Sequence, residues 1–205
     1  MTASQNAVSE IRSTAEMRRQ QILDAAAKCF VERGFHSAGM AMIAKESKMS
    51  VGHIYHYFAN KNDIIAALVE QEANIQSHHF EQFRNVAPEQ FLEVLTERIE
   101  ESVRRASDPF QSVLIREMLA ESQRNPRIAE IIQKHDKRAR DTFCMLVEDK
   151  LGISLSAAMI ELIFAIFSGI GLRVIKNPDL DKPALTQTIR TTIRQIFESE
   201  SAHSH

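Results

Sequence analysis

Apolar residues recur every three to four positions along most of this chain, which is the spacing of one buried helix face. Near the N-terminus the series is Ile22, Ala26, Cys29 and Phe30, and Gly34 follows as a stop signal. The pattern predicts helices over Glu16–Arg33, Met40–Ser47 and, with Ser50 as N-cap, Val51–Tyr57. Three short helices, the last two joined by a tight turn, are typical of a helix-turn-helix unit.

The periodicity continues in longer segments. Asn60 is the expected N-cap of a long fourth helix that starts at Lys61 and runs into the eighties. Further helices are predicted over Pro88–Ser107, Pro109–Gln123 and Pro126–Lys150, then from Ser154 or Ser156 to Ile175, and over Lys182–Glu198. The expected fold is all-α, with a three-helix head joined by the fourth helix to a helical body. The predicted divisions are a disordered tail (residues 1–14), a head (15–62, with the helix-turn-helix at about 39–58) and a C-terminal domain (63–200).

Composition and charge refine this picture. The chain has 205 residues, of which 44% are apolar and 25% charged, as in ordinary soluble proteins. Its net charge is −2, but residues 16–62 carry seven basic and four acidic residues, whereas 17 basic and 22 acidic residues follow from Asp63 onward. A mildly basic head on an acidic body is the asymmetry of a DNA-binding protein with a separate second module.

Other kinds of chemistry have little support. Cys29 and Cys144 lie in helical patterns without a paired spacing, as core thiols of a reducing compartment do. The N-terminus has no apolar signal segment, so a cytoplasmic location is expected. No nucleophile–base pair, metal-ligand set or phosphate loop is visible, so we expect neither an enzyme nor a bound metal or cofactor. His36, His53 and His56 are an alternative metal set, but no carboxylate or thiolate stands at a complementary spacing.

Both tyrosines of the chain, Tyr55 and Tyr57, lie in the predicted third helix. Ile54 and Phe58 share its core face, which leaves His53, His56 and Tyr57 on a solvent-facing surface. Phenol and imidazole groups donate hydrogen bonds to phosphates, and a helix in the major groove places them on the DNA backbone and base edges. Three neighbours fit the same role: Gly52 permits close approach, Val51 suits a thymine methyl group, and Lys61 adds a positive charge.

At these positions the chain resembles the TetR (tetracycline-repressor-like) family of bacterial transcription factors. The matching residues are Ile22-Leu23-Asp24-Ala25-Ala26, Phe30, Gly34-Phe35, Ile43-Ala44, Ser50-Val51-Gly52-His53-Ile54-Tyr55-His56-Tyr57-Phe58 and Lys61. The resemblance covers residues 19–65. It implies that Tyr55, His56, Tyr57 and Lys61 contact phosphates and that Val51, Gly52 and His53 lie nearest the bases.

Two departures from the family pattern matter. Ala38-Gly39 replace two hydroxyl residues at the start of the second helix, so Ser37 or bare backbone amides must contact phosphate there. Ser47-Lys48 replace Ala-Gly in the turn, where a left-handed lysine costs about 1 kcal/mol and adds a charge near DNA. The expected DNA-binding residues are Ser37, Gly39, Lys48, Ser50, Val51, Gly52, His53, Tyr55, His56, Tyr57 and Lys61.

The segment Leu155–Ile175 is almost entirely apolar. It nearly reaches the length of a membrane span, but it contains Glu161 and Arg173 and lacks an aromatic belt. A helix apolar all round in a soluble protein needs cover on every side, and a second subunit supplies that cover. The resemblance likewise implies a homodimer held by the last two helices. The predicted interface residues are Ile160, Phe164, Leu185, Ile189, Ile193 and Ile196.

Phenylalanine and methionine are frequent in the predicted body. Most are expected in the core, yet such side chains between helices also build pockets for lipophilic molecules. The family resemblance implies a ligand pocket, for which the candidates are Phe80, Phe83, Phe110, Leu114, Met118, Phe143, Phe164 and Phe167. Glu117 or Glu121 is a candidate to meet a cationic ligand.

The sequence therefore predicts a one-component transcription regulator, most simply a repressor. It would bind a pseudo-palindromic operator as a dimer and be released by a small-molecule inducer, with the fourth helix as the lever. The alternative is a dimeric helical ligand-binding or interaction protein whose head binds DNA weakly or not at all, which the Ala38-Gly39 departure makes conceivable.

Overall fold

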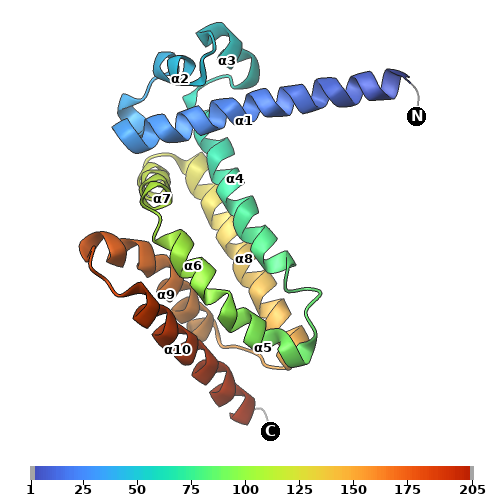
Figure 1. The fold of residues 1–205 in the computed structure, drawn as a ribbon, viewed down its shortest axis with the longest axis vertical. Helices are drawn as coiled ribbons and strands as arrows, with labels where there is room; N and C mark the ends of the chain where they lie inside the picture. Colours follow the sequence, from blue (N-terminus) through green and yellow to red (C-terminus); the bar gives the residue numbers. More distant parts are fainter. Residues whose placement is uncertain (1–2, 204–205) are drawn as a thin grey trace. The chain divides into compact units, whose positions relative to one another are not determined.

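The computed structural model describes residues 3–203, including the side chains of residues 14–75 and 77–200. The helices follow in the order α1 (Ala3–Ser37), α2 (Met40–Ser47), α3 (Val51–Tyr57), α4 (Lys61–Glu81), α5 (Pro88–Glu97), α6 (Ile99–Ala106), α7 (Pro109–Ser122), α8 (Pro126–Leu151), α9 (Ala157–Lys176) and α10 (Lys182–His203) (Figure 1). No strand occurs within this range, and the predicted all-α fold is confirmed.

Helix α1 is longer at both ends than the sequence pattern indicates. It begins at Ala3, within the segment predicted as a tail, of which residues 1–2 lie outside the described part of the chain. Gly34 does interrupt the helix as predicted, with φ 75° and ψ 159°, and one more turn follows it to Ser37. A positive φ is inexpensive only for glycine, so the break is fixed at this residue.

The turn and capping predictions are confirmed. Lys48 ends α2 in the left-handed conformation, with φ 56° and ψ 36°. Ser50 caps α3 because its Oγ accepts the amide of His53 at 3.1 Å. Asn60 Oδ1 accepts the amide of Asp63 at 3.1 Å and so caps α4. Each polar side chain satisfies an amide that the first helical turn leaves without a partner.

The prediction of one helix from Pro88 to Ser107 is wrong, because the helix breaks at Arg98 into α5 and α6. Arg190 Nε of α10 donates to the carbonyl of Thr96 at 3.1 Å. In a continuous helix that carbonyl would instead accept the amide four residues further along the chain. The Thr96 hydroxyl, with 1% of the residue exposed, also turns back to the carbonyls of Leu92 and Glu93, both at 2.9 Å.

The chain forms two compact units, and their boundary differs from the predicted one at residue 62. The first unit takes in the described residues up to Glu72 together with Leu114–Ile131. The second contains Ala73–Val113 and the chain from Ile132 onward. Helices α4, α7 and α8 thus contribute residues to both.

In the first unit α2 packs against α1, and α3 packs against α2 (Figure 1). Its largest fully buried side chains are Ile22, Leu23, Phe30, Phe35, Ile43, Ile54, Ile64, Ile65 and Ile128. Phe30 and Phe35 meet edge to face, with ring centroids 4.5 Å apart, so the residues on either side of the Gly34 break are anchored in one core.

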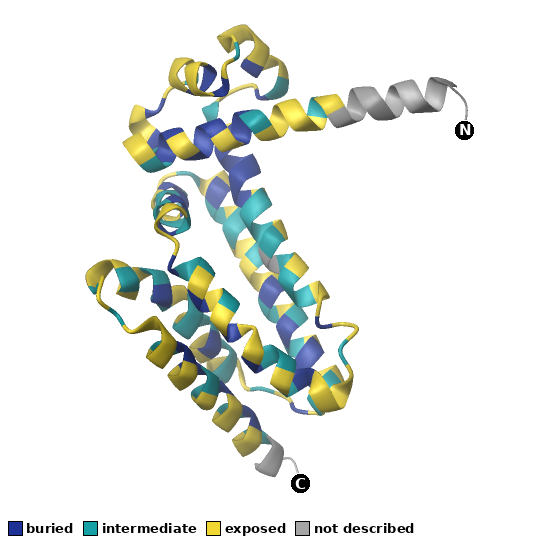
Figure 2. Ribbon diagram, viewed as in Figure 1, coloured by how far each residue is buried: buried dark blue, intermediate teal, exposed yellow. Residues whose placement is uncertain are grey.

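In the second unit α6 packs against α9, and α10 packs against α5 and α6. Phe143 lies at the centre of an aromatic group, within 6.5 Å of the rings of Phe80, Phe164 and Phe197. Exposed residues remain along α10 (Figure 2). Within residues 3–203, α9 has the length and apolar composition of a membrane span, and only 11% of its most apolar window is buried in this chain.

Candidate nucleic-acid interface

Helix α3 divides into a buried and an exposed face, as its sequence predicts. Ile54 and Phe58 are 0% and 4% exposed and hold the helix on the core of the first unit. Tyr55 is 51% exposed, Val51 is 36% exposed, and His53 also faces solvent. The helix thus presents donors and apolar groups to an external partner.

Tyr57 organises this surface. Its half-buried ring meets the rings of both His53 and His56 edge to face, with centroids 5.4 Å away in each case. These contacts limit the rotamers of three donor side chains before any partner arrives, which lowers the entropic cost of binding. A Cβ added at Gly52 would meet no atom within 4 Å, so the space above this residue is open to a close approach.

The N-terminus of α2 lies open, because none of the described side chains caps it. Gly39 is the N-cap residue, and its carbonyl accepts the amides of Met42 and Ile43 at 3.0 and 3.2 Å. The amides of Met40 and Ala41 precede them and point out of the helix end, where an anion is favoured. Ala38 is fully buried, so Gly39 is the exposed member of the departure from the family pattern, beside exposed Ser37.

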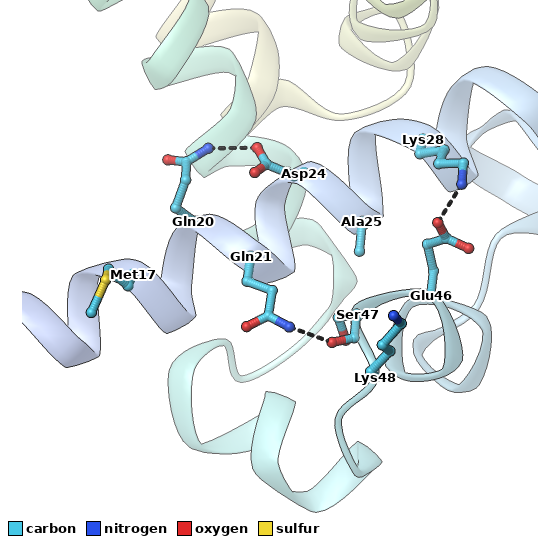
Figure 3. A pocket seen from close by; sticks show the side chains of 9 residues that line it. All are labelled: Met17, Gln20, Gln21, Asp24, Ala25, Lys28, Glu46, Ser47 and Lys48. Atoms are coloured by element: carbon cyan, nitrogen blue, oxygen red, sulfur yellow. Dashed lines mark hydrogen bonds and ion pairs between the residues drawn. The ribbon is translucent and has the colours of Figure 1, made fainter.

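A hollow of about 510 Å³ lies between α1 and the turn from α2 to α3 (Figure 3). Its lining residues are Met17, Gln20, Gln21, Asp24, Ala25, Lys28, Glu46, Ser47 and Lys48. The walls carry polar pairs: Lys28 with Glu46 at 2.5 Å, and the Gln21 amide with the Ser47 carbonyl at 2.7 Å. None of the predicted ligand-pocket residues lines this hollow. The mixed charge of its walls does not suit a phosphate.

Lys61 has partners that its sequence position does not reveal. Its ammonium donates to the carbonyls of Phe35 and His36, and the side chain is half-buried. Its proposed contact with DNA therefore stays a prediction. On the other side of the same segment, the Glu117 carboxylate accepts the amide of Phe35 at 3.0 Å. The sequence pattern indicates Glu117 only as a candidate partner for a cationic ligand, since a contact between residues 82 positions apart leaves no local signal.

The residues predicted to line a ligand pocket fall into different places. Phe80, Phe83, Phe143, Phe164 and Phe167 all belong to the apolar cluster of the second unit. Leu114 and Met118 lie buried in the first unit, and Phe110 is 38% exposed. The structure brings together the five phenylalanines of the cluster but not the whole predicted set.

Most residues predicted to form a dimer interface pack within the chain itself. Ile189 and Ile193 are 5% and 2% exposed, and Phe164, Leu185 and Ile196 pack against the same core. The large exposed apolar residues of α9 are instead Leu162, Leu172 and Ile175, at 49%, 47% and 47%. The hydrophobic pattern marks α9 as an apolar helix and α10 as an amphipathic one, but it does not indicate which face of α9 turns inward.

The remaining candidate chemistry is weak. Burial raises the pKa of both the Cys29 and the Cys144 thiols, so both are held in the less reactive protonated form. Among the described side chains, no three His, Cys, Asp or Glu residues are placed to hold a metal ion.

Comparison with known proteins agrees with this geometry. Residues 22–68 match the family model described as bacterial regulatory proteins, tetR family. The regulator UidR of Escherichia coli K12 is 34% identical over 127 residues, an alignment that spans 61% of this chain and 62% of UidR.

Two solved structures share the fold over most of the chain. Salmonella enterica GusR has a TM-score of 0.69 at 26% identity, covering 88% of this chain and 95% of its own. FadR of Bacillus subtilis, in complex with stearoyl-CoA, has a TM-score of 0.65 at 21% identity, covering 85% and 96%. The motif-bearing head, the matched relatives and the shared fold lead to one assignment. This chain belongs to the TetR family of bacterial regulatory proteins.

Proposed function

We propose that this chain is a one-component, ligand-responsive transcription regulator that acts in the cytoplasm. It binds a pseudo-palindromic operator as a homodimer and represses transcription until a small-molecule inducer releases it. The observation that carries this proposal is the exposed face of α3, where Tyr55 and His53 stand outward from a helix anchored by Ile54. Donor groups in this arrangement suit the floor and walls of a major groove.

The DNA contacts divide into positioning and reading contacts. Phosphates are met by Tyr55, His56, Tyr57, Lys48, Lys61 and Ser50, together with Ser37 and the backbone amides that follow Gly39. Val51, Gly52 and His53 reach the base edges. Because α2 presents amides rather than hydroxyl side chains, its phosphate contact depends on where the backbone lies, which makes the conformation of Gly39 and its neighbours important.

A second copy of the chain covers α9 in this proposal. Leu162, Leu172 and Ile175 form an exposed apolar surface on a helix of which little is buried in the protomer. Apolar area of this kind is stabilised by removal from water. Pairing α9 and α10 with their symmetry mates also gives two heads related by a twofold axis, which is what a pseudo-palindromic site requires.

The inducer site is proposed in the helical body. The phenylalanine cluster around Phe143 offers apolar walls for a lipophilic molecule. FadR of the same fold, whose structure contains stearoyl-CoA, supports a ligand-binding body. Binding that favours one arrangement of the body over another shifts the fraction of dimers able to bind DNA.

A gel-shift titration tests the DNA-binding part directly. Purified protein is titrated against the DNA flanking its own gene, at low and at near-physiological salt, with bulk DNA as competitor. A complex that survives competition at the higher salt supports a sequence-specific regulator.

Binding that is weak and lost with salt favours the alternative, a ligand-binding or interaction protein with an inactive head. A genome-wide DNA pull-down then separates an inactive head from an operator located elsewhere. Recovery of a discrete set of fragments supports a sequence-specific regulator whose operator lies elsewhere. Uniform recovery of all DNA contradicts sequence-specific binding.

A further inference from the structure

The Gly34 break leaves one backbone amide in need of a partner. In a continuous helix the amide of Phe35 would donate to the carbonyl of Val31. The conformation of Gly34, at φ 75°, ends that series. The Glu117 carboxylate of α7 takes the amide at 3.0 Å in a partly buried position. A Cβ added at Gly34 would stand 3.4 Å from the same Glu117 oxygen, so the carboxylate fits closely over the break.

The carbonyl side of the same segment is held by the opposite charge. Lys61, the first residue of α4, donates to the carbonyls of Phe35 and His36. Amide and carbonyl groups of one short segment are thus bound by a carboxylate from α7 and an ammonium from α4. Hydrogen bonds to charged groups are stronger than neutral ones, and an amide left buried without its acceptor is costly.

This segment determines where α2 begins. Only Ser37, Ala38 and Gly39 separate His36 from the first residue of α2. The amide of Ala38 donates to the Gly34 carbonyl at 3.2 Å, which ties the connection to the break itself. The Phe35 side chain is 2% exposed and packed on Phe30. The position of the Gly34–His36 segment therefore determines the position of the open amides at the start of α2.

Helix α7 reaches beyond the head. Its residues up to Val113 belong to the second unit, and its residues from Leu114 belong to the first. Leu114 and Met118 are 3% and 4% exposed, so this part of the helix is anchored in the unit that contains α1–α3. Glu117 lies between these two anchors and connects them to the backbone of Phe35.

We infer that Glu117 is a positioning residue for operator binding. Its carboxylate fixes the Gly34–His36 segment, and through it the phosphate-binding amides at the N-terminus of α2. A change in the body that withdraws α7 removes the acceptor from Phe35 and releases those amides. The inference rests on the proposed function, and it gives α7 a link to the DNA-binding surface in addition to that of α4.

Three variants test the role. Glu117→Gln keeps an acceptor oxygen and loses the charge, Glu117→Ala loses both, and Glu130→Ala removes a charge from an exposed position of α8 in the same unit. Two properties are measured: hydrogen exchange at the Phe35 amide, and affinity for the operator fragment at fixed salt. We expect Glu117→Ala to exchange about tenfold faster at Phe35 and to bind about tenfold more weakly. In the Gln variant and the Glu130 control the Phe35 amide should exchange as in the wild type, and both variants should bind the operator at least as tightly as the wild type.

Loss of negative charge alone strengthens binding to DNA, so weaker binding by Glu117→Ala cannot come from charge. If the wild type binds the operator and Glu117→Ala binds as tightly as Glu117→Gln, the inference is overturned while the proposed function stands. A wild type that selects no DNA overturns the proposed function and this role with it. Should the Ala variant not fold, Glu117→Asp, with its shorter side chain, provides the same comparison.

Discussion

Gly171 of α9 lies so close to Ser112 of α7 that a Cβ on the glycine would stand 2.9 Å from the serine hydroxyl oxygen. It would also stand 3.0 Å from the carbonyl of Ala106, to which that hydroxyl donates at 2.8 Å. The hydroxyl is committed to a backbone group, so it cannot easily move aside. Close packing of α9 on the end of α6 therefore requires a residue without a side chain.

Substitution of Gly171 by alanine should destabilise the second unit. The added methyl group overpacks a backbone contact, which costs about 1–3 kcal/mol, and the better helix propensity of alanine offsets up to about 1 kcal/mol. Gly169→Ala is the matched control, because a Cβ there meets nothing within 4 Å in the protomer. Urea unfolding of both variants, at equal protein concentration, should lower the midpoint for Gly171→Ala only. Equal midpoints would show that the contact yields without strain.

Lys48 offers a test of backbone strain in the head. Its φ of 56° is costly for a residue with a Cβ. Lys48→Gly should therefore raise the free energy of unfolding by about 1 kcal/mol. Lys48→Ala loses the same charge but keeps the Cβ, so it should not gain stability. Thermal unfolding of both variants separates the effect of backbone strain from the effect of the charge. Higher stability in the Ala variant would show that the charge of Lys48, and not its backbone conformation, is destabilising.

The sequence predicted the parts of this protein that depend on local chemistry. Gly34, Ser50 and Asn60 act where their conformational or capping preferences place them, and Ile54 and Phe58 turn inward at helical spacing. The missed features depend on contacts between distant positions. Arg190 binds the carbonyl of Thr96 from 94 residues away, next to the break of the predicted helix at Arg98, and Lys61 donates to carbonyls 25 and 26 residues earlier.

The stability of the second unit should depend on pH through His79. Burial first, and then the Arg105 charge, lowers the pKa of His79 from its ordinary value of 6.5. Arg105 Nη1 lies 3.4 Å from His79 Nε2. The unfolded chain thus binds a proton that the folded protein does not, so stability is full above about pH 6.5 and falls as the pH drops toward the lowered pKa.

Replacement of His79 by glutamine should reduce that loss. The exposed neighbour His78 provides the control, as His78→Gln leaves the half-buried imidazole of His79 in place. Free energies of unfolding are measured between about pH 7.5 and 5, the range that spans the ordinary histidine pKa. The free energy of unfolding should change less steeply with pH for His79→Gln than for the wild type or His78→Gln. Three equal slopes would exclude His79 as a source of the pH dependence.

The Tyr55 hydroxyl allows the proposed phosphate contact to be tested without changing charge. Tyr55→Phe retains the ring, which is half exposed, and should bind all DNA sequences about two- to tenfold more weakly, as expected for one lost hydrogen bond. The salt dependence of binding should be unchanged, whereas Lys48→Ala should lower its slope by about 1. Circular dichroism confirms that both variants fold. Unaltered affinity in Tyr55→Phe would place the hydroxyl away from the backbone.

The exposed face of α9 should hold two subunits together. Leu172 and Leu119 are almost equally exposed, at 47% and 49%, but Leu119 lies on α7 in the first unit. Leu172→Arg places a charge in the proposed dimer interface, where its desolvation opposes association, whereas Leu119→Arg adds the same charge elsewhere. Sedimentation equilibrium should show monomers for Leu172→Arg and dimers for the wild type and Leu119→Arg. Operator affinity should fall with dimer loss, because one head contacts only a half-site. If Leu172→Arg remained dimeric, the dimer interface would lie on another surface, and a different partner would have to cover α9.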